Sequence, residues 1–410
     1  MTGVWGGQTT LDSLPERRVM KTIRIFKSRG LIPILAAAFG VSVGFVSPAF
    51  AQNVAHTSVI VNPDGKVTYL GTPGGIYSEA VGINNSGQVA GNRFEAPNVG
   101  SVAFITGPNG IGMTDIGTLD KDFEHSVAFG INDTGQVVGE GPGSQQAFMT
   151  GHNGTDLTFF PRIGNALHHT ATAINESGQV VINAFFDGHQ AFITGPNGIG
   201  MTNLGSLGGI ATFANDINDA GQVVGYSYKG TDSRHAFITG PNGMGMTDLG
   251  TFGGDNSVAT GINNSGRVVG EYHIGPYHDL YLPPQAFITG PKGTGAADLG
   301  TLGGDESYAT GINDSGQVVG YSTTADGSRH AFITGPSGMG MTDLNSIADL
   351  PSGVYLRSAE GINNLGQVIA TATLAPIPEP GSYALMLAGF GLVGFMARRK
   401  KPAANTVSRS

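Results

Sequence analysis

A repeat runs through most of this chain and constrains its fold more than any single residue does. Each copy contains an Ala-Phe segment, a Gly-Gly link and an Ile-Asn segment, and a clear copy occupies residues 235–272. The Asn of the Ile-Asn segment recurs at intervals of 48, 43, 43, 45, 50 and 50 residues. The seven positions are Asn84, Asn132, Asn175, Asn218, Asn263, Asn313 and Asn363. A period of this length predicts supersecondary units that bury one another's faces.

Each copy has the pattern of four short strands. Segments such as AFIT, MTDLG, VATGIN and RVVGEY have strand length and are rich in β-branched or aromatic residues. The GPNG turns combine the fixed φ of proline with the freedom of glycine. In the NNSG and NDSG turns, the Asn or Asp side chain can form a hydrogen bond with the nearby backbone. The glycine that follows can adopt a left-handed conformation. The 67 glycines therefore serve turns, and the chain is not of low complexity.

Four strands in each of seven copies predict an all-β fold, a β-propeller of about seven four-stranded blades over residues 52–375. Radial packing covers each sheet with its neighbours and removes long exposed edges. Rings of six or eight blades remain alternatives, because the first copy and residues 165–169 are degenerate. The ring closes either with complete blades or by pairing residues 361–374 with 57–70. A parallel β-solenoid is the alternative fold, although its coils are usually shorter.

The N-terminal residues have the pattern of an export signal. Residues 1–19 have no evident role and are interpreted as a spurious extension. From Met20, basic residues precede an apolar run over residues 31–46. The run is followed by Ala49, Phe50 and Ala51, which form the A-x-A pattern of a signal peptidase site. We expect a helical signal peptide over residues 20–51 that is cleaved after Ala51, with an uncleaved anchor helix as the alternative.

The C-terminal segment has three parts in a fixed order. They are Pro378, Glu379 and Pro380, an apolar run over residues 383–397, and the basic residues Arg398, Arg399 and Lys400. An apolar run of this length is short for crossing a bilayer. Basic flanking residues favour the cytoplasmic side. The pattern predicts a short transmembrane helix within residues 376–401 and a disordered tail over residues 402–410, with an ordinary tail anchor or a short buried helix as alternatives.

This order of parts resembles the PEP-CTERM protein-sorting signal of Gram-negative bacteria. The resemblance implies that exosortase, a membrane enzyme, recognises Pro378, Glu379 and Pro380, in addition to the signal peptidase that acts at the N-terminus. Carriers of the signal are typically surface or secreted proteins associated with exopolysaccharide and biofilm. The protein would contact the membrane through its C-terminal helix before processing, or keep it as an anchor. Residues 402–410 depart from the family pattern, which usually stops at the basic cluster.

The repeats resemble the HAF family of probable extracellular repeats. The name describes a His-Ala-Phe sequence, which this chain carries at residues 235–237 and 330–332. Other copies have Val102, Gln146, Gln190 or Gln285 in place of the His. The HAF family has no well-defined activity, so this resemblance indicates a location rather than a chemistry.

Composition excludes several classes of function. Residues 52–378 contain 10 Lys and Arg against 27 Asp and Glu, a net charge near −17. Nucleic-acid binding requires clustered Lys and Arg and is excluded. The chain has no cysteine, so disulfides, thiol nucleophiles and thiolate-bound metals are excluded too. We predict no catalytic residue, no metal site and no cofactor. Calcium stays open, because the turns at Asn132-Asp133 and Asn313-Asp314 could supply oxygen ligands.

Residues that follow the repeat are predicted to be structural, and departures from it are candidates for function. The Phe of each Ala-Phe segment is expected to pack between blades, and His235 and His330 to bond a backbone carbonyl. The longest spacer, residues 271–285, is the predicted ligand loop, which could stack on a sugar or bind a metal. Its candidate residues are Tyr272, His273, Tyr277, His278, Asp279 and Tyr281. A surface loop stiffened by prolines is the alternative, and His168-His169 is a weaker candidate site.

These patterns predict a non-enzymatic, secreted protein that exosortase sorts to the cell surface or extracellular matrix. Its role would be binding or scaffolding, with extracellular polysaccharide as the partner and loops presented by a rigid ring. One alternative is a secreted glycan hydrolase or lyase on a propeller scaffold. The other is a calcium-stabilised structural protein.

Overall fold

The computed structural model describes residues 56–72, 74–95, 100–116, 125–141, 146–186, 188–230, 233–274 and 283–374. These residues form β-strands and short 3₁₀ turns. The predicted signal peptide with Ala49 and Ala51, the sorting signal and its basic cluster, and the predicted tail lie outside the described residues. Within the described part of the chain, no helix is long and apolar enough to span a membrane.

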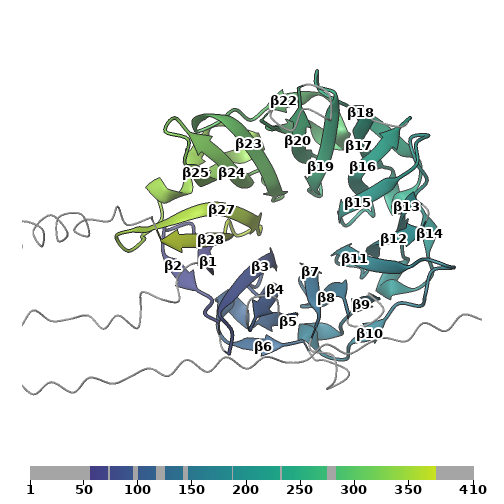
Figure 1. Ribbon diagram of the computed structural model, residues 1–410, viewed down its shortest axis with the longest axis horizontal. Helices are drawn as coiled ribbons and strands as arrows, with labels where there is room; N and C mark the ends of the chain where they lie inside the picture. The colour runs from purple at the N-terminus through teal and green to yellow at the C-terminus, as the bar shows by residue number, and fades with distance from the viewer. Residues whose placement is uncertain are drawn as a thin grey trace, which may run out of the picture. The chain divides into compact units, whose positions relative to one another are not determined.

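The described residues form seven antiparallel sheets of four strands, which surround a central axis as the blades of a propeller (Figure 1). Blade 1 contains β3 (Tyr77–Ile83), β4 (Val89–Phe94), β5 (Ser101–Thr106) and β6 (Met113–Asp115). Blade 2 contains β7 (Val127–Ile131), β8 (Val137–Glu140), β9 (Ala147–Met149) and β10 (Thr158–Phe159). Blade 3 contains β11 (His168–Ile174), β12 (Val180–Phe186), β13 (Gly188–Ile193) and β14 (Thr202–Asn203).

The remaining blades repeat the arrangement. Blade 4 contains β15 (Thr212–Ile217), β16 (Val223–Lys229), β17 (Ser233–Thr239) and β18 (Met246–Gly250). Blade 5 contains β19 (Asn256–Ile262), β20 (Val268–His273), β21 (Gln285–Thr289) and β22 (Ala296–Asp298). Blade 6 contains β23 (Gly303–Ile312), β24 (Val318–Thr324), β25 (Arg329–Thr334) and β26 (Met341–Asp343). Blade 7 contains β27 (Val354–Ile362), β28 (Val368–Leu374), β1 (Thr57–Val61) and β2 (Val67–Tyr69).

Short 3₁₀ turns connect the third and fourth strands of blades 1 to 6. They are η2 (Pro108–Gly110), η3 (His152–Gly154), η4 (Pro196–Gly198), η5 (Pro241–Gly243), η6 (Pro291–Gly293) and η7 (Pro336–Gly338). A further turn, η8 (Leu344–Ser346), follows β26. In η5, Asn242 has a φ of 56° and Gly243 a φ of 72°, the left-handed region that Asn and Gly tolerate best.

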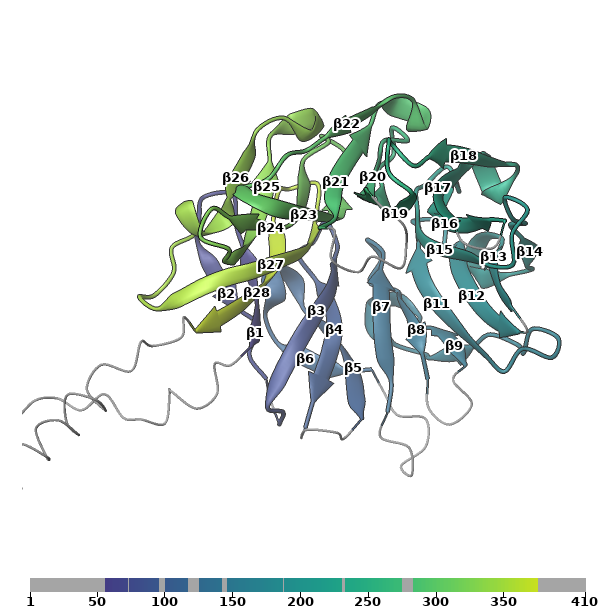
Figure 2. The same cartoon turned by 45° about the horizontal axis from the view of Figure 1, so that its top comes forward.

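The ring closes by pairing the two ends of the repeat region. Strand β1 lies antiparallel to β28, with Val59 opposite Ala370 and Val61 opposite Val368 (Figures 1 and 2). Blade 7 therefore takes its two inner strands from the end of the repeat region and its two outer strands from the beginning. The prediction of seven four-stranded blades is confirmed, and the parallel solenoid is excluded. Of the two closures that the sequence left open, the structure adopts the paired hairpins.

The core lies between blades, and the repeated Phe residues are its largest members. Each of the seven apolar clusters combines residues of two neighbouring blades. In one of them, Phe237 of blade 4 packs with Ile193 and Leu204 of blade 3. The ring of Phe104 in β5 lies over Gly91 in the neighbouring strand β4, where a Cβ would be 2.5 Å from Phe104 Cζ. Glycine at this position gives the ring the space to pack.

Most of the repeated Phe residues are fully buried, which confirms their predicted core role. They are Phe104, Phe148, Phe237, Phe287 and Phe332. Phe192 is only partly buried, because Ile182 stands opposite it where other blades have glycine opposite the Phe. Full burial of one such side chain contributes about 1.5–3 kcal/mol.

Candidate functional site

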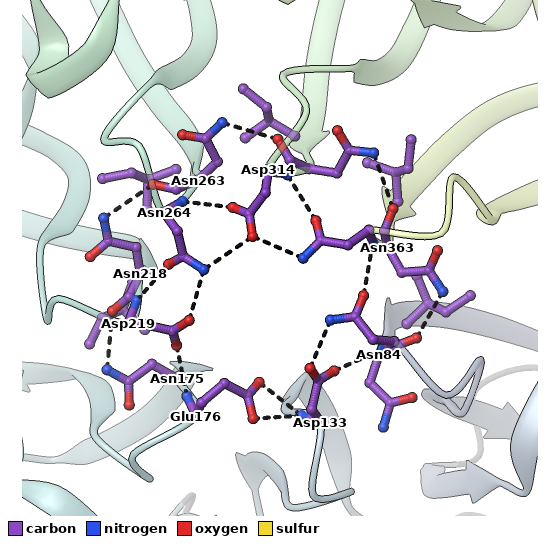
Figure 3. Close-up of a pocket in the computed structure, with 18 of the residues that line it drawn as sticks. Asn84, Asp133, Asn175, Glu176, Asn218, Asp219, Asn263, Asn264, Asp314 and Asn363 are labelled. Carbon is purple, nitrogen blue, oxygen red and sulfur yellow. Dashed lines mark hydrogen bonds between the residues drawn. The ribbon is translucent and has the colours of Figure 1, made fainter. Parts of the chain in front are cut away.

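The Ile-Asn segments of all seven blades meet at one end of the central channel (Figure 3). There, the side-chain amide of each repeated Asn donates to the backbone carbonyl of the repeated Asn in the next blade. The seven N···O distances are 2.9–3.1 Å. The seventh bond runs from Asn363 to Asn84 and closes the circle across the paired ends. We call these seven residues the asparagine ring.

Each member of the asparagine ring also shapes its own turn. The Asn84 side-chain oxygen accepts hydrogen bonds from the backbone N–H groups of Ser86 and Gln88. Gly87, between them, has a φ of 74°, so an L side chain there would be strained. The predicted Asx turn is confirmed. The bond to the next blade was missed, although the strict recurrence of Asn in all seven copies was a signal for it.

A second ring surrounds the axis one residue further along each turn. The backbone N–H of each member donates to the side-chain oxygen of the corresponding residue in the next blade, over 2.8–3.1 Å. We call this second ring the acid-amide ring. Its members are Asn85, Asp133, Glu176, Asp219, Asn264, Asp314 and Asn364. Four of the seven are acidic, and partial burial together with the neighbouring Asp133 and Asp219 raises the pKa of Glu176.

The two rings border a polar cavity of about 280 Å³ at the end of the channel. Its carboxylates are engaged in hydrogen bonds around the ring. Asp133 accepts from the Asn85 amide, and Asp314 accepts from the amides of Asn264 and Asn364. Within the described residues, no group of three or more His, Cys, Asp or Glu side chains is arranged to hold a metal ion. The arrangement locks the blades together and presents amide and carboxylate groups at the channel end.

Deeper in the channel, Asp216 replaces the Gly or Ala that the other six blades carry at this position of the inner strand. Its carboxylate accepts from the backbone N–H of Ile217 at 2.8 Å and from that of Ile262 in blade 5 at 2.9 Å. Burial nevertheless raises its pKa to about 6. The signal for this residue was its departure from the repeat, in NDIN instead of TGIN.

The predicted ligand loop is only partly described. Tyr272 and His273 lie at the end of β20, and Tyr277, His278, Asp279 and Tyr281 lie outside the described residues. The Tyr272 hydroxyl donates to Asp298 at 2.8 Å, and burial together with this bond raises the pKa of Tyr272 to about 12. His273 Nε2 lies 3.6 Å from Glu271 Oε2. The structure thus gives Tyr272 and His273 separate partners.

The histidines of the two His-Ala-Phe copies have carboxylate partners, not the expected backbone carbonyls. His235 Nδ1 lies 2.9 Å from Asp248, and His330 Nδ1 lies 2.7 Å from Asp343. Burial opposes ionisation of Asp248, but hydrogen bonds from Gly250, His235 and Lys229 lower its pKa. His169, in the weaker candidate pair, is buried with Nδ1 3.2 Å from the Ala147 N–H, and burial lowers its pKa. These contacts connect strands within or between blades.

Comparison with known proteins gives one sequence match and a set of fold matches. Residues 376–400 match the PEP-CTERM protein-sorting motif. A search of curated proteins found no match. A prolyl endopeptidase structure aligns with a TM-score of 0.52 and 12% identity, covering 71% of this chain and 50% of the other. The chain thus spans half the length of that structure, and at this identity the likeness shows the fold alone.

Two further structures align less closely. The β-propeller domain of the Trilobed protease from Pyrococcus furiosus has 11% identity and a TM-score of 0.48, with 73% of this chain and 92% of that domain covered. TolB from Acinetobacter baumannii has 10% identity and a TM-score of 0.40, with 59% and 62% covered.

Proposed function

We propose that this chain is a secreted binding or scaffolding propeller that exosortase sorts to the cell surface or extracellular matrix. The observation that carries the proposal is the PEP-CTERM motif over residues 376–400, which implies export and surface sorting. The motif begins two residues after β28 ends at Leu374. Because the last strand is paired on both sides, by β27 and β1, the sorting segment follows a fixed element of the ring.

The geometry supports a binding role more than a catalytic one. The carboxylates at the channel end accept hydrogen bonds from backbone and side-chain amide N–H groups around the acid-amide ring. The His-Asp pairs of blades 4 and 6 connect strands within their own blades. A rigid ring whose blades are bonded in a circle can present several loops at fixed spacing. Presentation of this kind raises the avidity for a repetitive partner without any strong single contact.

The partner class that we propose is extracellular polysaccharide, and the predicted ligand loop would contact it. Aromatic rings stack on sugar faces, and Tyr and His side chains add hydrogen bonds. A glycan array with purified protein tests this part of the proposal. Saturable binding that is weakened by Tyr277→Ala and His278→Ala supports it, and unchanged binding in these variants contradicts it. Turnover of a glycan that is lost in His273, His278 or Asp279 variants would establish the enzyme alternative instead.

Intact mass spectrometry of the protein from its native host tests the sorting part of the proposal. Loss of the residues C-terminal to the Pro378–Pro380 region is the expected result, together with loss of residues up to Ala51. The Glu379→Ala variant should keep the C-terminal mass, whereas Lys401→Ala, outside the recognised residues, should be processed normally. A wild-type protein that retains residues 381–410 would contradict exosortase processing and favour a permanent anchor.

A further inference from the structure

The interface between blades 6 and 7 contains a pocket of about 390 Å³. We call it the seam pocket, because it borders blade 7, in which the two ends of the repeat region pair. Its apolar wall consists of Val61, Ile333, Leu344, Ile347, Leu365 and Val368. Two of these are exposed at the surface, Ile347 at 50% and Leu365 at 61%. Exposed apolar side chains around a concave site indicate an interaction surface.

The corresponding space at the other interfaces is filled by the turn between the third and fourth strands. In blades 1 to 6, the glycine at the end of this turn donates its N–H to a glycine carbonyl of the same blade. The acceptor glycine lies in the turn between the first and second strands, at 2.9–3.0 Å. The turn glycine also packs against the preceding blade. At Gly243, a Cβ would be 2.6 Å from Leu204 and 2.7 Å from Ile193. The turn thus fills the apolar gap between two blades.

Blade 7 holds its turn elsewhere. Its sequence is NPDGK at residues 62–66, in place of the GPNG type. The Gly65 carbonyl accepts from the Asp349 N–H at 2.8 Å, and Gly65 lies against the Ile347 carbonyl, so the turn is drawn towards the segment after η8. Ile333 and Leu344, the equivalents of Ile193 and Leu204, are therefore left facing the pocket.

The displaced turn leaves specific polar groups without partners. Among the described residues, the carbonyls of Leu365 and Gly366 accept no hydrogen bond, whereas their counterparts Ala220 and Gly221 in blade 4 accept from the turn. The Gln317 side-chain nitrogen also has no partner within the described part of the chain. Its counterpart Gln179 donates to the turn residue Asn242 of the next blade. The pocket therefore combines two acceptors, one donor and an apolar wall.

Leu365 is a second departure from the repeat at the same place. The other six blades carry Ser, Thr or Ala at this position, for example Ser315 in blade 6. The Ser315 hydroxyl bonds Asn313 in the asparagine ring, which a leucine cannot do. The exposed leucine side chain thus makes no hydrogen bond in its own turn, but it extends the apolar wall of the seam pocket outwards.

We propose that the seam pocket binds a Pro-Asn-Gly type turn presented by another protein. The three intramolecular Pro-Asn-Gly turns, η2, η4 and η5, are the template for this ligand. Consecutive N–H groups of such a turn match the Leu365 and Gly366 carbonyls, its Asn side chain matches Gln317, and its glycine fits against Ile333 and Leu344. An acyl chain would leave the three polar groups unpaired on desolvation. A second copy of this chain has its own Pro-Asn-Gly turns already docked, so a different protein is the expected partner.

The test uses a fluorescent cyclic peptide that copies residues 239–247, TGPNGMGMT. We expect a saturable rise in fluorescence anisotropy with the full chain in detergent micelles. Thr342, an exposed residue at the pocket wall, is changed to Trp to fill the pocket. Thr342→Trp should weaken binding at least about tenfold, a loss of about 1.4 kcal/mol. The matched control is Thr247→Trp, at the same position of blade 4, which should leave binding unchanged.

A second pair of changes keeps the test decisive if Thr342→Trp unfolds the protein, which a thermal melt would show. Gln317→Leu in the protein, and Ala for Asn in the peptide, should each weaken binding about threefold to tenfold. Combined, they should weaken it no more than either alone, because both remove the same hydrogen bond. Absence of saturation up to about 1 mM peptide would overturn the proposal.

Two other occupants would also overturn it. A fluorescent fatty acid that competes with the peptide and is expelled by Thr342→Trp would identify an acyl site. Self-association that Thr342→Trp abolishes would identify a second copy. The inference deepens the proposed binding role but does not use the sorting signal or the ligand loop. Failure of peptide binding would therefore leave the mass-spectrometric and glycan results untouched.

Discussion

The interface between blades 3 and 4 and the interface between blades 6 and 7 use the same repeat in two different ways. In the first, η5 docks on its own blade, Gly243 fills the gap to blade 3, and Asn242 accepts from Gln179. In the second, the turn is displaced and a pocket takes its place. The asparagine ring nevertheless crosses both with bonds of 3.1 Å, from Asn175 to Asn218 and from Asn313 to Asn363. Closure of the ring therefore depends on the asparagine ring at the axis and on the pairing of β1 with β28. The turns between the third and fourth strands are free to vary.

Core substitutions at the two interfaces should give the largest difference. Phe237→Ala removes a fully buried ring between blades 3 and 4 and should lower the free energy of unfolding by about 3–5 kcal/mol. Val59→Ala, at the equivalent place in β1, removes less volume and should cost less. Urea unfolding of both variants measures the difference. Equal losses would show that the paired strands at blade 7 carry more of the stability than their buried volume indicates.

Substitutions in the asparagine ring should have equal effects at both places. Asn218→Ala leaves the Asn263 carbonyl and two turn N–H groups without their partner, at a cost of about 3 kcal/mol. Asn363→Ala removes the same bonds across the closure, to Asn84, and should cost as much. Unfolding midpoints at constant m-value provide the comparison. A much smaller loss for Asn363→Ala would mean that the ring is weak where the chain ends meet.

The pH dependence of stability should distinguish blade 4 from the blades that carry Gly or Ala at the position of Asp216. Because the folded pKa of Asp216 is raised to about 6 from 3.8, its protonated form is favoured in the fold. Stability from this group is present below pH 4 and is lost as the pH rises through 6. Relative to Asp216→Gly, the wild type should lose about 2 kcal/mol between pH 4 and pH 8. Parallel pH profiles of the two proteins would refute this.

The interblade glutamines should show a smaller contrast. Gln179→Leu removes the interblade hydrogen bond to Asn242, and the loss of this bond should cost about 1 kcal/mol. Gln317→Leu removes no interblade bond among the described residues. Both variants lose the bond that the glutamine Oε1 accepts from its ring Asn, so Gln317→Leu should cost about 1 kcal/mol less than Gln179→Leu. Thermal denaturation of the two variants is sufficient. A comparable loss in Gln317→Leu would mean that the seam pocket is closed in solution.

Chelation should have the smallest effect. The four carboxylates of the acid-amide ring accept hydrogen bonds around the axis, so we expect Tm to be unchanged by EDTA. A fall in Tm that added calcium reverses would support the calcium-stabilised alternative. In that case, Asp133→Asn without EDTA should melt at the Tm of the EDTA-treated wild type if the acid-amide ring holds the calcium.

Much of the fold follows from local sequence patterns. Strand length, turn residues and the spacing of Ala-Phe and Ile-Asn predicted seven blades, and the Phe residues were correctly assigned to the core. The candidate site was harder to predict from the sequence. The role of the Asn residues as interblade donors requires knowing that residues 43–50 apart in the chain are neighbours at the axis. The partners of His235 and His330 depend on strand four of the same blade, and the predicted backbone carbonyls were wrong.

The sequence by itself determined the repeat unit, its two turns, the interblade Phe and the sorting motif, because each depends on residues close together in the chain. The tertiary structure decided how the ring closes, which carbonyl each ring Asn reaches and where a pocket remains. These features depend on β1 meeting β28 more than 300 residues later, for instance Val59 opposite Ala370. The NPDGK turn differs little from its counterparts in sequence. In the tertiary structure its Gly65 carbonyl accepts from Asp349, after η8, and the turn lies away from the gap that the other turns fill.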